Sequence, residues 1–155
     1  MKSGHPEGAE RLERMRAAVR ASPRSTAFVA LAHALCDEGF REEAEAVCLQ
    51  GLLHHPDLPT AQVALARAWL ESGKTAQAEM RLMETIHQHR HHADAYRYLA
   101  KVMAITGRRA EAVAMLTRTS ILIGTDVAED GVPAEFKIVS LLHVASMEPL
   151  TNQAA

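Results

Sequence analysis

His33 and Cys36 have the residue types and the spacing of a base and a nucleophile. They are three positions apart, so a helix would place both side chains on one face. A thiol activated by a histidine also needs donors that stabilise the oxyanion and a third group that orients the base. The sequence shows neither. We therefore expect no catalytic residues and no enzymatic activity.

Nine histidines raise the question of a metal site, because imidazole is a common ligand of Zn²⁺ and Ni²⁺. The run HQHRHH covers residues 87–92, and a second pair, His54 and His55, lies earlier in the chain. The run has no ordered ligand spacing and no cysteine beside it. We expect a solvated, weakly cationic rim, with neither a metal site nor a cofactor.

The composition limits the class of partner. The 155 residues are 48% hydrophobic but only 4% aromatic, which favours a single helical domain with many alanines. Seventeen Lys and Arg against nineteen Asp and Glu give a formal charge of −2, so there is no general footprint for nucleic acid or for an anionic membrane. The partner that we expect is therefore another protein.

The cysteines and the apolar runs bear on the compartment. Cys36 and Cys48 are expected to point in different directions and to stay reduced. We expect no secretory signal at the N-terminus, because no apolar run follows Lys2. The longest apolar stretch, residues 27–36, has about half of the ~20 residues that a membrane span needs. We expect a cytoplasmic protein.

A period of 34 residues organises the chain. Gly39, Gly73 and Gly107 are 34 positions apart, and a glycine between two helices permits a turn with positive φ. Around each glycine, small and large apolar residues recur in the same order. This pattern predicts helix, turn and helix, three times, and an all-α fold. The recurring residues are Leu31, Leu65 and Leu99, then Ala32, Ala66 and Ala100, and after the glycine Ala44, Ala78 and Ala112.

The period divides the chain into a capped array. Residues 1–24 are expected to form an N-terminal capping helix, with Leu12, Met15, Ala18 and Val19 as its apolar stripe. The three repeats are residues 25–58, 59–92 and 93–126. Residues 127–155 are expected to hold an acidic linker, an apolar helix from Pro133 to Met147 and a tail. Stacking of the repeats supplies the core.

The order of residues within a repeat resembles the tetratricopeptide repeat. The resemblance covers residues 25–126 and implies a right-handed α-solenoid with a capping helix at each end. Two details depart from the family pattern: Gln62 stands where an aromatic residue or leucine is usual, and Arg90 and Gly124 replace a terminal proline. In the first repeat the pattern is formed by Phe28, Leu31, Ala32, Leu35, Gly39, Ala44, Cys48, Gly51 and Pro56.

The resemblance implies that the first helices of the repeats line a concave groove, which binds a peptide or a helix of another protein. One end of the groove is expected to be apolar and small. The other end is expected to carry three exposed cations, Arg67, Arg97 and Lys101, beside Tyr98. Such a groove suits a partner with an apolar face and nearby carboxylates. The groove-facing residues are Thr26, Val29, Ala30, His33, Cys36, Thr60, Val63, Ala64, Arg67, Leu70, Asp94, Arg97, Tyr98 and Lys101.

Three functions remain open at this point. The first is a protein-binding scaffold or adaptor that uses the groove. The second is a chaperone similar to those of bacterial type III secretion translocators, which hold an apolar client segment. The third is self-association, in which the apolar helix at residues 133–147 docks into the groove of its own chain or forms a homodimer.

Overall fold

The computed structural model describes residues 6–124 of the chain, and within them the all-α prediction is confirmed. Seven helices and no strands make up this part. None of its helices is long and apolar enough to cross a membrane. The predicted apolar helix at residues 133–147, and the linker before it, lie outside the described residues. The helices are α1 (Pro6–Ala21), α2 (Ala27–Asp37), α3 (Arg41–Leu52), α4 (Pro59–Glu71), α5 (Thr75–Gln88), α6 (Ala93–Ile105) and α7 (Arg109–Ile123).

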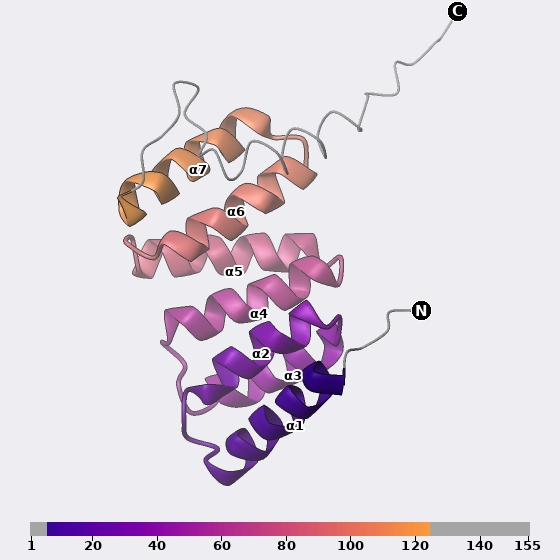
Figure 1. The fold of residues 1–155 in the computed structure, drawn as a ribbon. Helices are drawn as coiled ribbons and strands as arrows, with labels where there is room; N and C mark the ends of the chain where they lie inside the picture. Colours follow the sequence, from indigo (N-terminus) through magenta and orange to yellow (C-terminus); the bar gives the residue numbers. More distant parts are fainter. Residues whose placement is uncertain (1–5, 125–155) are drawn as a thin grey trace, which may run out of the picture.

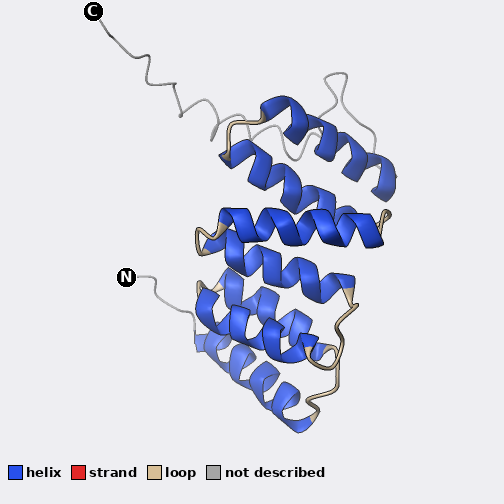
Figure 2. Ribbon diagram, turned by 180° about the vertical axis from the view of Figure 1, so that it is seen from behind, coloured by secondary structure: helices blue, strands red, loops and turns tan. Residues whose placement is uncertain are grey.

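The helices stack as antiparallel pairs in two layers. The first helices of the pairs, α2, α4 and α6, form one layer, in which α2 contacts α4 and α4 contacts α6 (Figure 1). The second helices, α3, α5 and α7, form the other layer, which faces the viewer in Figure 2. Helix α1 packs against α2 at one end of the stack. The result is a helical repeat array whose first helices share one face.

The three turn glycines have the positive φ that the sequence predicts. Their φ angles are 86° at Gly39, 79° at Gly73 and 80° at Gly107. A Cβ added at any of them would meet no atom within 4 Å. Crowding therefore does not exclude a side chain at these turns, and the left-handed backbone alone accounts for the glycine.

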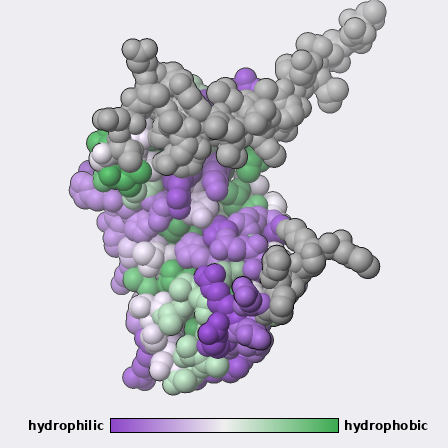
Figure 3. Space-filling model, in the orientation of Figure 1, coloured by the Kyte–Doolittle hydropathy of each residue, from purple (hydrophilic) through white to green (hydrophobic). Residues whose placement is uncertain are grey.

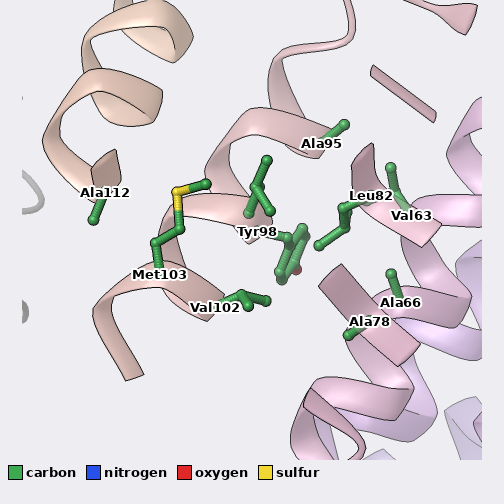
Figure 4. Packing of buried hydrophobic residues seen from close by; sticks show 10 residues of the cluster. Val63, Ala66, Ala78, Leu82, Ala95, Tyr98, Val102, Met103 and Ala112 are labelled. Atoms are coloured by element: carbon green, nitrogen blue, oxygen red, sulfur yellow. The ribbon is translucent and has the colours of Figure 1, made fainter. Parts of the chain in front are cut away.

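Helix α4 lies at the centre of the core. It is buried on most sides because α2, α3, α5 and α6 all contact it. Its alanines let these neighbours approach closely, while large side chains from α5 and α6 fill the remaining space. Figure 4 shows Leu82 of α5 beside Tyr98 and Val102 of α6. The buried residues of α4 are Ala61, Gln62, Val63, Ala64, Leu65, Ala66 and Ala68.

Ion pairs at equivalent positions join successive repeats. Lys74 binds Glu45 of the preceding repeat at 2.7 Å, and Arg108 binds Glu79 at 2.6 Å. Both pairs join residues 29 positions apart, so they follow the 34-residue period. In the third repeat, Val113 takes the position of the two glutamates. Among the described residues, the acid that binds the following repeat is therefore present in the first two repeats only.

The N-terminal helix is tied to the first repeat by both apolar and ionic contacts. Leu12 is buried in a cluster with residues of α2 and α3. Arg16 binds Glu43 of α3 through Nη2 at 2.6 Å and through Nε at 2.7 Å. Ala18, which the sequence placed in the apolar stripe, is exposed, because α1 has a neighbour on one side only.

Gln62, an unexpected polar residue in the core, has partners for its amide. Its Nε2 donates to the carbonyl oxygen of Pro56 at 2.9 Å, and its Oε1 accepts from the Thr85 hydroxyl at 2.9 Å. Tyr96 occupies the same position in the next repeat, and its hydroxyl donates to the carbonyl of Arg90 at 3.1 Å. Both side chains therefore hold the loop that precedes their own helix, and the departure from the family pattern leaves no orphaned amide.

Phe28 occupies the position of Gln62 and Tyr96 in the first repeat. Its ring leaves room only for a glycine at position 51 of α3. A Cβ built on Gly51 would lie 2.3 Å from the Phe28 ring. The equivalent of Gly51 in the second repeat is Thr85, which faces Gln62. Each of these two repeats therefore matches the size of the residue on its second helix to the residue on its first.

We expect Gly51→Ala to lower the free energy of unfolding by about 1–3 kcal/mol, because the buried Phe28 ring must move. An alanine inside a helix would otherwise add about 0.5–1 kcal/mol, so the sign of the change is informative. Urea unfolding measures it. The double variant Phe28→Leu with Gly51→Ala should lose less stability than the sum of its two single variants, and strict additivity would contradict the proposed contact.

Candidate functional site

The face formed by α2, α4 and α6, which we call the first-helix face, carries two columns of residues in step with the repeat. One column is His33, Arg67 and Lys101, which are 34 positions apart. The residues four positions later form the second column, Asp37, Glu71 and Ile105. Side chains at i and i+4 are neighbours on a helix, so each basic residue faces the member of the second column on its own helix.

Arg67 joins the columns of the first two repeats. Its Nη2 donates to Asp37 at 2.6 Å, and its Nε donates to Glu71 at 2.8 Å. Its Nη1 lies 3.2 Å from Nδ1 of His33. One guanidinium therefore binds residues of both α2 and α4, in the planar arrangement of donors that lysine cannot reproduce.

The sequence-based expectation that Arg67 is exposed is wrong. Only 17% of its side chain is exposed, and two carboxylates already neutralise it. Sequence reasoning missed Asp37 and Glu71 as its partners. The signal was present, because both acids stand four positions after a member of the basic column.

The third repeat differs, because its cations surround an aromatic ring. Lys101 Nζ lies 4.9 Å from the centre of the Tyr98 ring, and the Arg97 guanidinium carbon lies 5.3 Å from it. Arg97 also binds Asp94 through Nη2 at 2.7 Å. Partial desolvation, with Arg97 and Arg67 nearby, lowers the pKa of Lys101. Burial raises the pKa of the Tyr98 hydroxyl.

Two cations at this end are not fully paired within the described residues. Lys101 has no carboxylate within 4.0 Å there, because Glu71 is bound by Arg67 and because Ile105 replaces the acid of the second column. The Nε of Arg97 has no hydrogen-bond partner in the same part of the chain. The first-helix face therefore ends in positive charge that its own residues leave only partly compensated.

The remaining predicted groove residues are distributed between surface and core. Val63 and Ala64 are buried and offer no area to a partner in this structure. Val29 and Leu70 are half-buried, and Ala30 is exposed. In Figure 3, apolar areas are scattered between polar ones on the visible face.

His33 and Cys36 do not form an activated pair. Burial raises the pKa of the Cys36 thiol to about 11, and the carboxylate of Glu71 adds to this. The pKa of His33 is lowered by burial and by Arg67, the group that its ring faces. Cys48 is buried as well, with a pKa raised to about 12, and both cysteines are free. The thiolate is therefore disfavoured at both positions.

The histidines of the predicted rim serve local structure where they are engaged. His55 Nε2 lies 2.6 Å from the carbonyl oxygen of Arg24, and its ring stacks on Phe28 with centroids 6.1 Å apart. Burial lowers the pKa of His92. Over residues 6–124, no group of three or more His, Cys, Asp or Glu side chains is placed to hold a metal ion.

A hollow of about 540 Å³ lies away from the first-helix face, beside the turns between paired helices. Phe40, Glu43, Glu45 and Lys74 are among its lining residues. Glu43 is bound by Arg16, and Glu45 by Lys74 and the Trp69 indole. Since these carboxylates are engaged, the hollow offers weaker grounds for a binding site than the cations of α6.

The comparison with known proteins supports the fold. No family model matches the chain, and no curated protein matches it. Among solved structures, the crystal structure of MamA is similar, with a TM-score of 0.59 and 19% sequence identity. The match covers 72% of this chain and 66% of the MamA chain, just under two thirds of its length. This similarity supports an all-α fold of stacked helices for the chain.

Charge reversal should separate the structural cation from the surface cation. Arg67→Glu is expected to lower the free energy of unfolding by about 2 kcal/mol or more, because it places a third carboxylate against Asp37 and Glu71. Lys101→Glu should lower it by about 1 kcal/mol or less, since the contact with the Tyr98 ring is lost but no ion pair among the described residues is broken. Urea unfolding of both variants measures the difference, and equal losses would contradict the assignment.

Stability should fall as the pH drops below about 6.5. The folded state holds the pKa of His33 below its usual value, so the unfolded chain takes up the proton first. The urea midpoint should therefore be lower at about pH 5.5 than at about pH 7.5. His33→Gln should flatten this dependence without removing it, because His92 shifts in the same direction. An unchanged slope in the His33 variant would show that burial and the nearby charges of Arg67, Asp37, Asp94 and Arg97 do not shift the pKa of His33.

Proposed function

We propose that the chain is a tetratricopeptide-repeat protein that works as a protein-interaction scaffold. The binding surface is the first-helix face, which corresponds to the concave groove implied by the repeat resemblance. The observation that carries this proposal is the pair of incompletely compensated cations, Arg97 and Lys101, around the Tyr98 ring. Lys101 is the last member of the column of basic residues that runs through all three repeats.

The partner is a peptide or a helix with an apolar face and nearby carboxylates. A carboxylate placed against partly desolvated cations gains a charge-assisted hydrogen bond. Ile105 is 55% exposed on the same helix, and Leu70 of α4 is half-buried. These two side chains supply apolar contact area beside the cations, so a mixed acidic and apolar segment fits better than a purely acidic one.

The fold favours a scaffold over an enzyme. Helix pairs that are stabilised by their neighbours present a broad, rigid face. The ring of His33 faces the Arg67 guanidinium, and burial raises the pKa of the Cys36 thiol, so the two residues are not arranged as a base and a nucleophile. The surface that remains available, namely the α6 cations and the apolar side chains beside them, supports the proposal of an adaptor.

The double variant Arg97→Glu with Lys101→Glu tests the proposal. We expect it to lower partner affinity about tenfold or more while the protein stays folded, because charges that complement a partner are replaced by repelling ones. Arg14→Glu, which reverses one charge at an exposed position of α1 at the other end of the stack, is the control. Affinity capture from cell extract with mass spectrometry identifies proteins that bind the wild type and the control but not the double variant.

Each protein so identified is then purified, and its binding is measured by calorimetry. Equal affinity for the wild type and the double variant would move the binding surface away from α6. A loss of affinity with Arg14→Glu as large as with the double variant would show that net charge, and not this face, controls binding.

A further inference from the structure

We propose that the acidic residues after α7 bind the cations of α6 within the same chain, so that the chain's own C-terminal segment occupies the first-helix face. This inference rests on the proposed function, because it assigns an occupant to the same surface. The occupant is residues 125–149, which lie outside the described part of the structure and whose charges and apolar residues are known from the sequence.

The periodicity of the first-helix face identifies a missing acid. Arg67 has two carboxylates, Asp37 from the preceding repeat and Glu71 from its own helix. The residues 34 positions later are Lys101 in place of Arg67, Glu71 in place of Asp37, and Ile105 in place of Glu71. Glu71 is bound by Arg67, and isoleucine accepts no hydrogen bond. Lys101 is therefore the member of the column that has a place for a further carboxylate.

The chain supplies carboxylates soon after its last described helix. Asp126, Glu129 and Asp130 lie within residues 125–131, which contain no Lys or Arg. The charges are complementary, since the incompletely compensated groups at this end of the first-helix face are cations. The segment that follows, residues 133–149, is rich in apolar side chains, which suits contact with Ile105 and Leu70.

The distances allow the connection within one molecule. Helix α7 ends on the side of the stack where α6 begins (Figure 1). Lys101 is eight residues into α6, about 12 Å along its axis. The five residues that follow Gly124, up to Glu129, can span up to about 17 Å. An acidic residue of this segment therefore reaches Lys101 without a long connector.

A spin label on the segment provides the test in the full-length protein. Ala128→Cys places a reactive thiol between the acids, while Cys36 and Cys48 are buried with raised pKa values and react slowly. We expect the label to broaden the NMR signals of Arg97, Tyr98 and Lys101, and to leave those of the distant helices α1 and α3 unchanged. A label that broadens no signal on α6 would overturn the proposal.

Charge exchange then tests the contact itself. Lys101→Glu should lower the docked population about fivefold, and adding Glu129→Lys with Asp130→Lys should restore it. Arg14→Glu should leave it unchanged. The neutral variant Asp126→Asn, Glu129→Gln, Asp130→Asn lies outside the described helices and should repeat the loss without altering them. Failure of the exchange to restore docking would also overturn the proposal.

A mixture of two protein samples separates the chain's own segment from that of a second copy. One sample carries the spin label at natural isotope abundance, and the other is ¹⁵N-enriched and unmodified. Broadening of the α6 signals in this mixture would assign the occupant to a second copy and overturn the intramolecular contact.

The partner measurements remain a separate readout. If partners depend on Arg97 and Lys101 but the segment does not dock, the scaffold function stands and this inference fails. If the segment docks and no partner depends on the cations, the docking inference stands and the proposed binding of partners by these cations fails.

Discussion

A pair of antiparallel helices buries only one side of each helix, so its other apolar faces need cover from the next pair. The whole array depends on this constraint. Helix α4 shows the result, because neighbours from two layers and three repeats bury almost every small residue along it. The 34-residue spacing brings the next pair into register, and the alanines set the distance at which it packs. Individual core side chains vary while this spacing is kept. The first repeat packs Phe28 against Gly51, and the second packs Gln62 against Thr85 at the same positions.

The parts of the fold that depend on local backbone chemistry were predictable from the sequence. Glycines at equal intervals indicated three turns of positive φ, and the structure has them at Gly39, Gly73 and Gly107. The inward position of Gly51 followed from its place in the repeat, although the identity of its neighbour, the Phe28 ring, did not. Periodicity reports which face of a helix is inward. It does not report which side chain fills the space opposite.

The candidate site was less predictable because it depends on distances between helices. Arg67 has the sequence position of a recognition residue, yet two carboxylates from α2 and α4 bind it. Val63 and Ala64 occupy groove positions in the repeat pattern, yet the closeness of α2 and α6 to α4 buries them. The same period, applied to acids as well as to apolar residues, would have found the column of Asp37 and Glu71. The third repeat breaks that column at Ile105, and this break distinguishes α6 from the other first helices.

The ion pairs between repeats give the array a direction. The second repeat has a base, Lys74, that binds backward to Glu45, and an acid, Glu79, that binds forward to Arg108. A duplicated copy of this repeat, inserted beside the original, would find a complementary charge on both sides. The third repeat has the backward base but has Val113 in the place of the forward acid. The array can therefore lengthen by duplication of its middle unit, whereas a unit added after the third repeat would place its base against an apolar residue instead of a carboxylate.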